Sequence, residues 1–350
     1  MKILIVISTP EMGGAQRVSF NLAKWVNMHS DDEICIVALG KSSRNAYKTT
    51  EYDYEELQKG NRILQLRTIV KRKSPDIVLT MGVPLALYTV PALLGLGVKH
   101  VISERNDPAH FAGKKTTRFF SRLLMRFADG FVFQTKQAQA YYCKNIGKRS
   151  VVIHNPLYDV PQTVSERELK RNEIVSVGRL NKQKNQKLLI CAFEDIHKMF
   201  PTFRLIIYGE GPERRNLENY IKELNLDKYI LLPGSVNDIL DRIRDSYMFV
   251  MTSDFEGMPN ALMEAMSLGL PCISTDCPCG GPAELIVNQI NGRLVPVGDK
   301  DSLINAMKEM IENKRKAEDL GREARRICDS HSIDKICNEW YNYFVKIVES

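Results

Sequence analysis

Residues 255–275, FEGMPNALMEAMSLGLPCIST, join two apolar runs of the sequence. The first run, YMFVMTS, ends at Ser253, and the second begins at Pro271. Between them the chain turns through Gly257 and Pro259 and then has the composition of a helix. Apolar runs without polar alternation suit strands that are buried on both faces of a parallel sheet. The segment therefore predicts a strand, a loop, a helix and a second strand of an α/β domain.

The same alternation extends in both directions along the chain. Apolar runs that fit buried strands lie at 173–178, 203–209, 229–234, 247–253, 271–275 and 292–297. A second series lies at 3–8, 34–39, 76–80, 100–103, 130–133 and 151–154, with helix-like segments near 14–28, 54–72, 84–96, 114–127 and 136–143. Two such series predict two doubly wound, Rossmann-like α/β domains.

A polar stretch with a proline and many charges separates the two series. We expect an N-terminal domain at 1–157, a linker at 158–172 and a C-terminal domain at 173–330. The last segment, 331–350, repeats apolar residues at three-to-four spacing, which predicts an amphipathic helix that covers the core. The residues of this stripe are Ile333, Cys337, Trp340, Phe344 and Val348.

Composition limits the class of protein. A chain of 350 residues with 44% hydrophobic and 26% charged residues has enough material for two soluble domains. It has no run of roughly 20 apolar residues that would span a membrane, and its start lacks a signal-peptide cleavage pattern. We therefore expect a cytoplasmic protein. The eight cysteines are scattered without CxxC pairs, which favours reduced thiols over a disulfide framework or a metal site.

Charge is unevenly distributed between the two halves. Residues 1–155 contain 23 Lys and Arg against 12 Asp and Glu, a net charge of +11. Residues 156–350 contain 26 against 30, a net charge of −4. We expect only the first half to attract anionic partners.

The turn EGMPN lies where open parallel sheets bind ligands, beyond the carboxyl end of a strand and at the start of a helix. Glu256 precedes the helix and Glu264 follows eight residues later, so both side chains can face one ligand. Carboxylates accept hydrogen bonds from sugar hydroxyls. The backbone amides near Gly257, Met258 and Asn260 can donate hydrogen bonds to a diphosphate.

The pattern E-x7-E from Glu256 to Glu264, within EGMPNALMEAM, resembles glycosyltransferase family 4. Members are retaining enzymes of the GT-B fold, with two Rossmann-like domains facing a central cleft. The resemblance covers nearly the whole chain. It implies that Glu256 holds the donor hexose and Glu264 the nucleotide ribose, with the donor nucleotide diphosphate sugar in the C-terminal domain and the acceptor in the N-terminal domain. The turn residues that it places at the donor are Gly257, Met258, Pro259 and Asn260.

Three further strand-end segments match the family. In VGRLNKQKNQ (177–186), the resemblance gives Arg179 and Lys184 the role of neutralising the leaving diphosphate. YGEGPER (208–214) matches a loop where glycines let backbone approach the ligand, and PGSVNDI (233–239) matches a loop beside the nucleobase. The donor-binding residues implied by these segments are Gly178, Gly209, Gly211 and Val236.

Of two further segments in the first half, one matches the family and one departs from it. STPEMGGAQR contains Gly13 and Gly14 at a strand-to-helix turn, where the family's glycine loop contacts the donor or the acceptor. Many members carry a histidine after the strand that ends at 103, whereas this chain has SERN at 103–106. We expect Arg105 or Asn106 to face the acceptor in its place.

Residues 110–127, HFAGKKTTRFFSRLLMRF, combine cations with large apolar residues. Such a helix either buries its apolar face in its own domain or lies in a lipid interface with its cations toward anionic headgroups. Together with the positive first half, the segment favours transient docking on the anionic inner surface of the cell membrane. The candidate docking residues are Lys114, Lys115, Arg118, Arg122 and Arg126.

No Asp-x-Asp string follows a strand where it could hold Mg²⁺, so we expect no cofactor and a metal-independent reaction.

An oxidoreductase would need a GxGxxG fingerprint, and a nucleic-acid-binding protein would need aromatics among its basic residues. A nucleotide-sugar epimerase of the same fold would need acid and base residues that no motif of this sequence supplies. We expect a hexose or N-acetylhexosamine, with UDP the first choice of nucleotide, to pass to a polyprenyl-diphosphate-linked saccharide in O-antigen or capsule assembly. The epimerase and the nucleic-acid-binding protein stay as alternatives.

Overall fold

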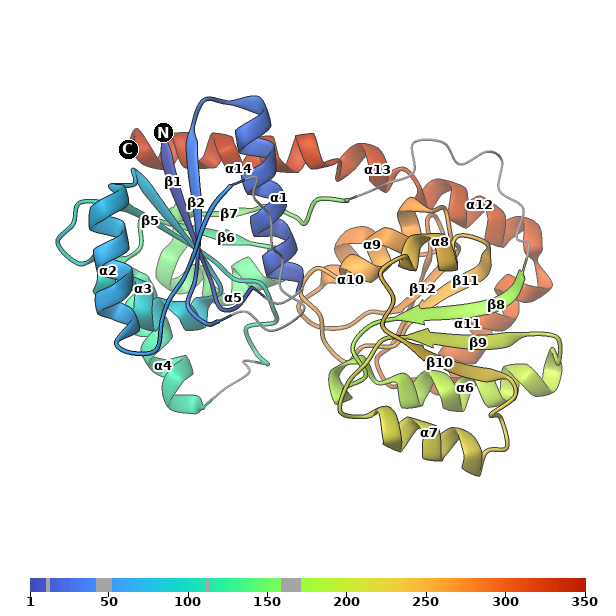
Figure 1. Cartoon of the computed structure of the whole chain (residues 1–350). Helices are drawn as coiled ribbons and strands as arrows, with labels where there is room; N and C mark the ends of the chain where they lie inside the picture. Colours follow the sequence, from blue (N-terminus) through green and yellow to red (C-terminus); the bar gives the residue numbers. More distant parts are fainter. Residues whose placement is uncertain (11–12, 42–51, 111–113, 159–170) are drawn as a thin grey trace. The chain divides into compact units, whose positions relative to one another are not determined.

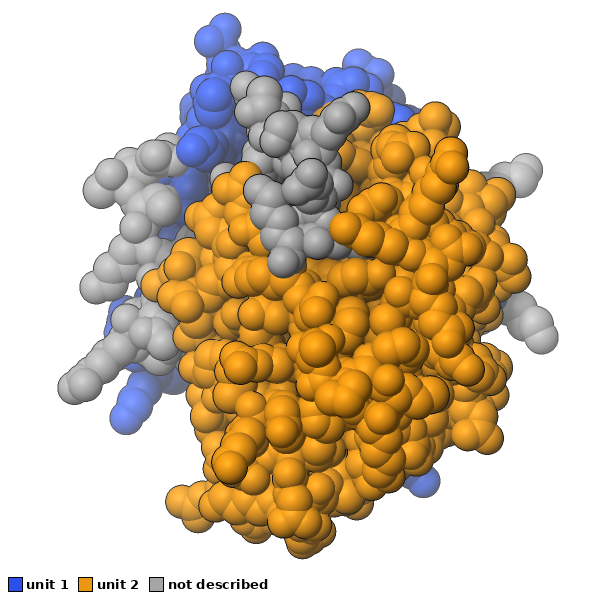
Figure 2. All heavy atoms as spheres, turned by 90° about the vertical axis from the view of Figure 1, so that its right-hand side faces the viewer, with its two compact units in different colours: residues 1–156, 333–350 blue, residues 157–332 orange. Residues whose placement is uncertain are grey.

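The computed structural model describes residues 1–10, 13–41, 52–110, 114–158 and 171–350. The chain divides into two compact units, which Figure 2 colours blue and orange. Unit 1 consists of Met1–Pro156 and Ile333–Ser350, and unit 2 of Leu157–Ser332. Of the predicted linker, residues 159–170 lie outside the described residues, and Arg171 and Asn172 begin a strand of unit 2.

Unit 1 is built on a parallel sheet of seven strands in the described residues, in the order β3-β2-β1-β4-β5-β6-β7 (Figure 1). The strands are β1 (Lys2–Ile7), β2 (Glu33–Ala38), β3 (Asp53–Glu56), β4 (Ile77–Met81), β5 (Lys99–Ser103), β6 (Gly130–Phe133) and β7 (Ser150–Val152). The helices are α1 (Gly14–His29), α2 (Arg62–Lys73), α3 (Ala86–Leu93), α4 (Lys115–Leu124), α5 (Lys136–Ile146) and α14 (Ile333–Val348), with short turns η1 (Val83–Leu85), η2 (Met125–Phe127) and η3 (Gly147–Arg149).

Strand β3 corrects one sequence prediction. The helix expected near 54–72 begins only at Arg62, and residues 53–56 extend the sheet at its edge beside β2. An edge strand pairs on one side and is only half-buried, so DYEE lacks the apolar run that marks an interior strand. Its carboxylates are instead neutralised by cations at the end of α2.

Unit 2 has a parallel sheet of six strands among the described residues, in the order β10-β9-β8-β11-β12-β13. The strands are β8 (Arg171–Val177), β9 (Arg204–Tyr208), β10 (Ile230–Gly234), β11 (Ser246–Met251), β12 (Cys272–Thr275) and β13 (Arg293–Val295). The helical elements are η4 (Lys182–Lys184), α6 (Gln186–Met199), α7 (Arg214–Glu223), α8 (Ile239–Ile243), α9 (Asn260–Ser267), α10 (Gly281–Leu285), α11 (Lys300–Glu312), α12 (Lys314–Ala324) and α13 (Ile327–Ser330).

Both sheets are covered on both faces by apolar side chains of the flanking helices. In unit 1, α1 and α14 pack on one face and α2 with α3 on the other. In unit 2, α6, α7 and α11 pack on one face and α9 on the other. The predicted α/β class with two Rossmann-like sheets is confirmed, because burial on both faces produces the apolar strands from which it was inferred.

The strand order reverses once in each sheet. The reversal falls between β1 and β4 in unit 1 and between β8 and β11 in unit 2. At such a point neighbouring strands send their following loops to opposite faces, which opens a crevice at the carboxyl edge. The loops after β8 and β11 are those that contain the two most specific sequence motifs.

The predicted C-terminal helix is present as α14, and it completes the core of unit 1. Its buried side chains include Trp340, which is 1% exposed, and Phe344, which is fully buried, within the same apolar cluster as β1, β2 and α1. Trp25 Nε1 of α1 donates to Asp334 Oδ1 at 2.9 Å. The Tyr343 hydroxyl accepts from Phe131 N at 3.0 Å and donates to Arg149 O at 2.9 Å.

We predict that Phe344→Ala destabilises unit 1 by about 3–5 kcal/mol, since truncation of a buried aromatic side chain leaves a cavity. Both tryptophans of the chain, Trp25 and Trp340, belong to unit 1. Urea unfolding followed by tryptophan fluorescence therefore reports on this unit. The exposed Lys346→Ala on the same helix is the control and should leave the midpoint almost unchanged. An unchanged midpoint in Phe344→Ala would show that the core does not depend on α14.

Candidate functional site

Two loops of unit 2 are joined at the point where the strand order reverses. One follows β8 at residues 178–185, and the other follows β11 at residues 252–259. The hydrogen bonds that connect them include Asp254 N to Gln183 O at 2.8 Å, Gln183 Nε2 to Phe255 O at 2.9 Å, Asn185 Nδ2 to Asp254 Oδ1 at 2.8 Å, and Thr252 Oγ1 to Asn185 O at 3.0 Å. These bonds fix the two loops as one platform.

An ion pair lies on this platform. Lys184 Nζ contacts Glu256 Oε1, and the same oxygen accepts a hydrogen bond from Ser253 Oγ at 2.7 Å. Glu256 is only 7% exposed, and its backbone N–H donates to Pro278 O at 2.9 Å. A carboxylate buried to this extent is stable as an anion only with such partners. The structure thus brings together two of the residues that the sequence singled out, 72 positions apart.

Arg179 lies in the same loop as Lys184 and is exposed. Its backbone oxygen accepts from Gln186 Nε2 at 3.0 Å, which fixes the main chain at this position. Within the described ranges, the guanidinium of Arg179 forms no ion pair. An arginine with a fixed main chain and no ion pair at its guanidinium can bind an incoming anion without first breaking another ion pair.

Two glycines after β9 allow that loop to lie against the loop after β8. At Gly209, φ is 143°, and an added Cβ would lie 2.0 Å from Gly178 O. At Gly211, an added Cβ would lie 2.2 Å from Leu180 O. Both positions are therefore closed to larger residues by neighbouring backbone. The sequence predicted a close approach to a ligand here, and the close approach that the structure provides is to the Gly178–Leu180 backbone.

The turn EGMPN is buried as far as Pro259. Gly257 approaches the next loop so closely that a Cβ at Gly281 would lie 1.7 Å from Gly257 O. Met258 is 6% exposed and belongs to the apolar cluster below. Asn260 begins α9, and Glu264 of that helix is 8% exposed. Val236, after β10, is partly buried against the same cluster.

The loop after β12 is part of the site and was not anticipated from the sequence. Besides Pro278 O, it provides Cys277, whose thiol pKa is raised to about 12, first by burial and then by the negative charge of Glu256. Thr275 Oγ1 donates to Ser253 O at 2.6 Å. The position of β12 beside β11 could have pointed to this loop, but strand order is not encoded in any local pattern.

In unit 1, the turn after β1 is described only in part, since Glu11 and Met12 lie outside the described residues. Gly14 begins α1, and Gly13 precedes it with φ −157°, an extended conformation that any residue adopts. The turn is fastened by Gln16, whose Nε2 donates to Thr9 O at 3.1 Å.

The SERN segment is organised by Glu104 rather than by the two residues that follow it. Glu104 is 6% exposed, and its Oε1 accepts from Arg105 N at 2.9 Å and Asn106 N at 3.3 Å. Burial raises the pKa of this carboxyl, and the hydrogen bonds it accepts oppose the shift. Arg105 is half-buried and donates to Asn155 Oδ1, while Asn106 is exposed and Ser103 is buried. Asn106 is thus the more accessible of the two expected acceptor-side residues.

Helix α4 and the turn after it carry their apolar side chains on the outside. Phe119 is 64% exposed, Phe120 52%, Leu123 43% and Phe127 69%. We call these four residues the apolar face of α4. Three of the candidate docking cations are exposed as well: Lys114, Lys115 and Arg126. Arg118 and Arg122 turn instead toward the hydroxyl of Tyr141.

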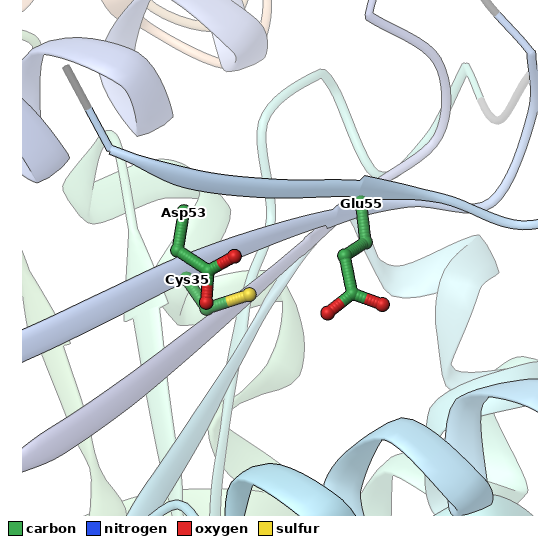
Figure 3. A group of neighbouring side chains, drawn as sticks. All are labelled: Cys35, Asp53 and Glu55. Atoms are coloured by element: carbon green, nitrogen blue, oxygen red, sulfur yellow. The ribbon is translucent and has the colours of Figure 1, made fainter. Parts of the chain in front are cut away.

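One group of side chains in the described residues has the spacing of a metal site. The ligand atoms of Cys35, Asp53 and Glu55 lie within 4.8 Å of one another (Figure 3). However, burial raises the pKa of the Cys35 thiol to about 12, and cations already neutralise the carboxylates. Lys73 Nζ pairs with Asp53 and lies 3.4 Å from Glu55, and Arg72 is 2.5 Å from Glu55. The group fastens α2 to the edge strand, and its carboxylates are already paired with Lys73 and Arg72.

None of the described helices is long and apolar enough to cross a membrane.

Comparison with known proteins agrees with this architecture. Residues 162–327 match the family model of glycosyl transferases group 1. The chain is 23% identical over 99% of both lengths to a Campylobacter jejuni α-1,4-N-acetyl-D-galactosaminyltransferase that acts on a diNAcBac-PP-undecaprenol-linked saccharide. Over 42% of this chain and 38% of the relative, it is 39% identical to an Escherichia coli UDP-Gal:α-D-GlcNAc-diphosphoundecaprenol α-1,3-galactosyltransferase.

Among solved structures, Anabaena HepE in complex with UDP superposes with a TM-score of 0.83 at 19% identity, over 99% of this chain and 100% of that one. At this identity the likeness establishes the fold. The likeness and the family match together show a chain of the GT-B fold whose residues 162–327, with the strand-end motifs of unit 2, match glycosyl transferases group 1.

Proposed function

We propose that this glycosyltransferase moves a hexose or N-acetylhexosamine, with retention of configuration, from a UDP-sugar to a polyprenyl-diphosphate-linked saccharide. The observation that carries the proposal is the Lys184–Glu256 pair at the carboxyl ends of β8 and β11, with Arg179 exposed in the same loop as Lys184. A nucleotide diphosphate sugar presents anionic oxygens and hydroxyls, the two kinds of group that these side chains bind. The names of the Campylobacter and Escherichia relatives support the undecaprenyl-linked acceptor, and the latter supports UDP.

In the donor complex, Arg179 and Lys184 bind diphosphate oxygens, Glu256 accepts from a sugar hydroxyl, and Glu264 accepts from the ribose. Lys184 then exchanges a carboxylate oxygen for a phosphate oxygen. Glu256 keeps the hydrogen bond from Ser253 and gains one from the sugar. The backbone amides of the turn at 257–260 lie at the start of α9 and add donors for the diphosphate.

Glu256 is poorly suited to attack the anomeric carbon. In the donor complex its carboxylate still accepts a hydrogen bond from Ser253 Oγ and also one from the sugar hydroxyl, and such contacts lower the nucleophilicity of a carboxylate. The remaining route has the acceptor hydroxyl approach the face that the diphosphate leaves and pass its proton to a phosphate oxygen. Arg179 and Lys184 stabilise the charge that grows on the diphosphate. This chemistry is complete without a bound metal ion.

We predict that Arg179→Ala and Lys184→Ala each lower kcat by an order of magnitude or more, because a preorganised donor to developing charge is worth about 10²–10³ in rate. The matched control is Lys182→Ala, an exposed lysine of the same loop that forms no ion pair in the described residues. UDP release from UDP-N-acetylgalactosamine or UDP-galactose, with a synthetic polyprenyl-diphosphate saccharide, measures the rate. If both variants raised KM and left kcat unchanged, Arg179 and Lys184 would not act in the chemical step.

A second prediction concerns stereochemistry. Transfer from an α-linked UDP-sugar should give an α-linked product, since the acceptor attacks the face that the diphosphate leaves. Proton NMR of the product decides this, because the anomeric coupling constant separates α from β in gluco- and galacto-configured sugars. A β-linked product would contradict the front-face route.

The proposal extends to the place where the enzyme acts. A polyprenyl-linked acceptor is held in the inner face of the cell membrane, and the apolar face of α4 with Lys114, Lys115 and Arg126 has the composition of an interfacial helix. The net charge of +11 on the first half of the sequence favours acidic lipid. Because Arg118 and Arg122 bind Tyr141, we assign headgroup contact to the other three cations.

We predict that Phe119→Ser with Phe127→Ser abolishes most binding to vesicles that contain phosphatidylglycerol, since burial of a phenylalanine contributes about 1.5–3 kcal/mol. High salt should weaken binding only in part, because three exposed cations are screened and the apolar contacts are not. Met28→Ser, at a methionine of α1 that is 69% exposed, is the control. If the double variant co-sedimented with vesicles as the wild type does, α4 would not be the membrane-binding element.

A further inference from the structure

Helix α4 is fastened to unit 1 through its arginines. Arg118 Nη1 donates to Ala109 O at 3.3 Å, and Arg122 Nη2 donates to Pro108 O at 3.5 Å. Both guanidinium groups also donate to the hydroxyl of Tyr141 on α5. The cations that the sequence would assign to headgroups therefore bind the loop at residues 104–110, which follows β5.

Arg122 also connects α4 to a buried carboxylate. Its guanidinium carbon lies 4.7 Å from the ring centroid of Tyr141 and 5.6 Å from that of Tyr142. The Tyr142 hydroxyl donates to Glu104 Oε2 at 3.1 Å, and its ring stacks on Phe133 at 5.4 Å between centroids. A continuous set of contacts thus runs from α4 through α5 to the first residue of the loop.

The loop itself is shaped by its own side chains. Glu104 accepts from the backbone N–H groups of Arg105 and Asn106, and Asp107, which is 3% exposed, accepts from Ala109 N at 2.8 Å. A shift of the Glu104 carboxylate therefore moves the amides of the next two residues. Every contact in this set lies within unit 1.

We propose that Arg122, Tyr142 and Glu104 are positioning residues that couple α4 to the loop at 104–110, so that docking of α4 on an acidic lipid surface fixes Arg105 and Asn106 for the acceptor. The inference rests on the proposed function, which supplies both the lipid surface and the acceptor side of the loop. The inference adds a physical connection between the lipid surface and the acceptor side of the loop. Burial of the apolar face in lipid restricts how α4 can move, and the two arginines transmit that restriction to the loop.

Hydrogen–deuterium exchange tests the coupling in the full chain. The probe is a vesicle of phosphatidylcholine with phosphatidylglycerol, compared with no vesicle. In the wild-type protein, vesicles should slow exchange in α4 and also at the amides of Arg105 and Asn106. We expect about fivefold slowing at these amides, the equivalent of one hydrogen bond of about 1 kcal/mol.

Tyr142→Phe removes the hydroxyl that donates to Glu104 and keeps the ring beside Arg122 and Phe133. In this variant, vesicles should still protect α4 and should no longer protect the loop. The matched control is Tyr343→Phe, which loses a hydroxyl bonded to the backbone of the same unit and should keep both effects. This control separates the coupling from a general loss of stability.

Any result other than those two would contradict the inference. Protection of the loop in Tyr142→Phe equal to that in the wild type would overturn it. Protection of α4 in the wild type without any change in the loop would overturn it while leaving lipid docking intact. Absence of vesicle protection in α4 itself would overturn both the docking proposal and the coupling.

Discussion

The ion pair of Lys184 and Glu256 constrains the second unit, because a carboxylate as buried as that of Glu256 needs polar and charged partners. To bring them together, β8 and β11 must be neighbours, and the loops that follow must meet on one edge of the sheet. The glycines after β9 let a third loop close over the first. Ser253 Oγ then donates to the Glu256 carboxylate, and Pro278 O accepts from the Glu256 backbone N–H and fixes the main chain there. The platform is thus preorganised by backbone contacts, which is the property that electrostatic stabilisation of a leaving group requires.

Much of this fold could be predicted from the sequence because strands buried on both faces leave apolar runs that local patterns detect. The sequence pattern predicts helix at the edge strand β3, since the segment DYEE is stabilised by Arg72 and Lys73 at the end of the following helix α2 rather than by its own composition. The candidate residues Lys184 and Glu256 were each identified through a motif. That they bind one another depends on strand order, which no local pattern contains.

Helix α4 shows a second limit of sequence patterns. Its periodicity predicts an apolar side and a charged side, but periodicity does not tell which side meets solvent. The structure exposes Phe119, Phe120, Leu123 and Phe127 and turns Arg118 and Arg122 inward. The role of Glu104 is hidden from sequence patterns for a related reason. A glutamate between a strand and an arginine resembles a surface residue until Tyr142, 38 positions later in the chain, is placed against it.

Helix α14 has a consequence for how the protein is made. The core of unit 1 includes Trp340 and Phe344, yet these residues leave the ribosome after all of unit 2. During synthesis the first sheet therefore emerges with part of its apolar surface uncovered, and its core closes only when residues 333–350 follow. A nascent chain that stops before residue 333 carries an unfinished first unit, open to chaperones and proteases.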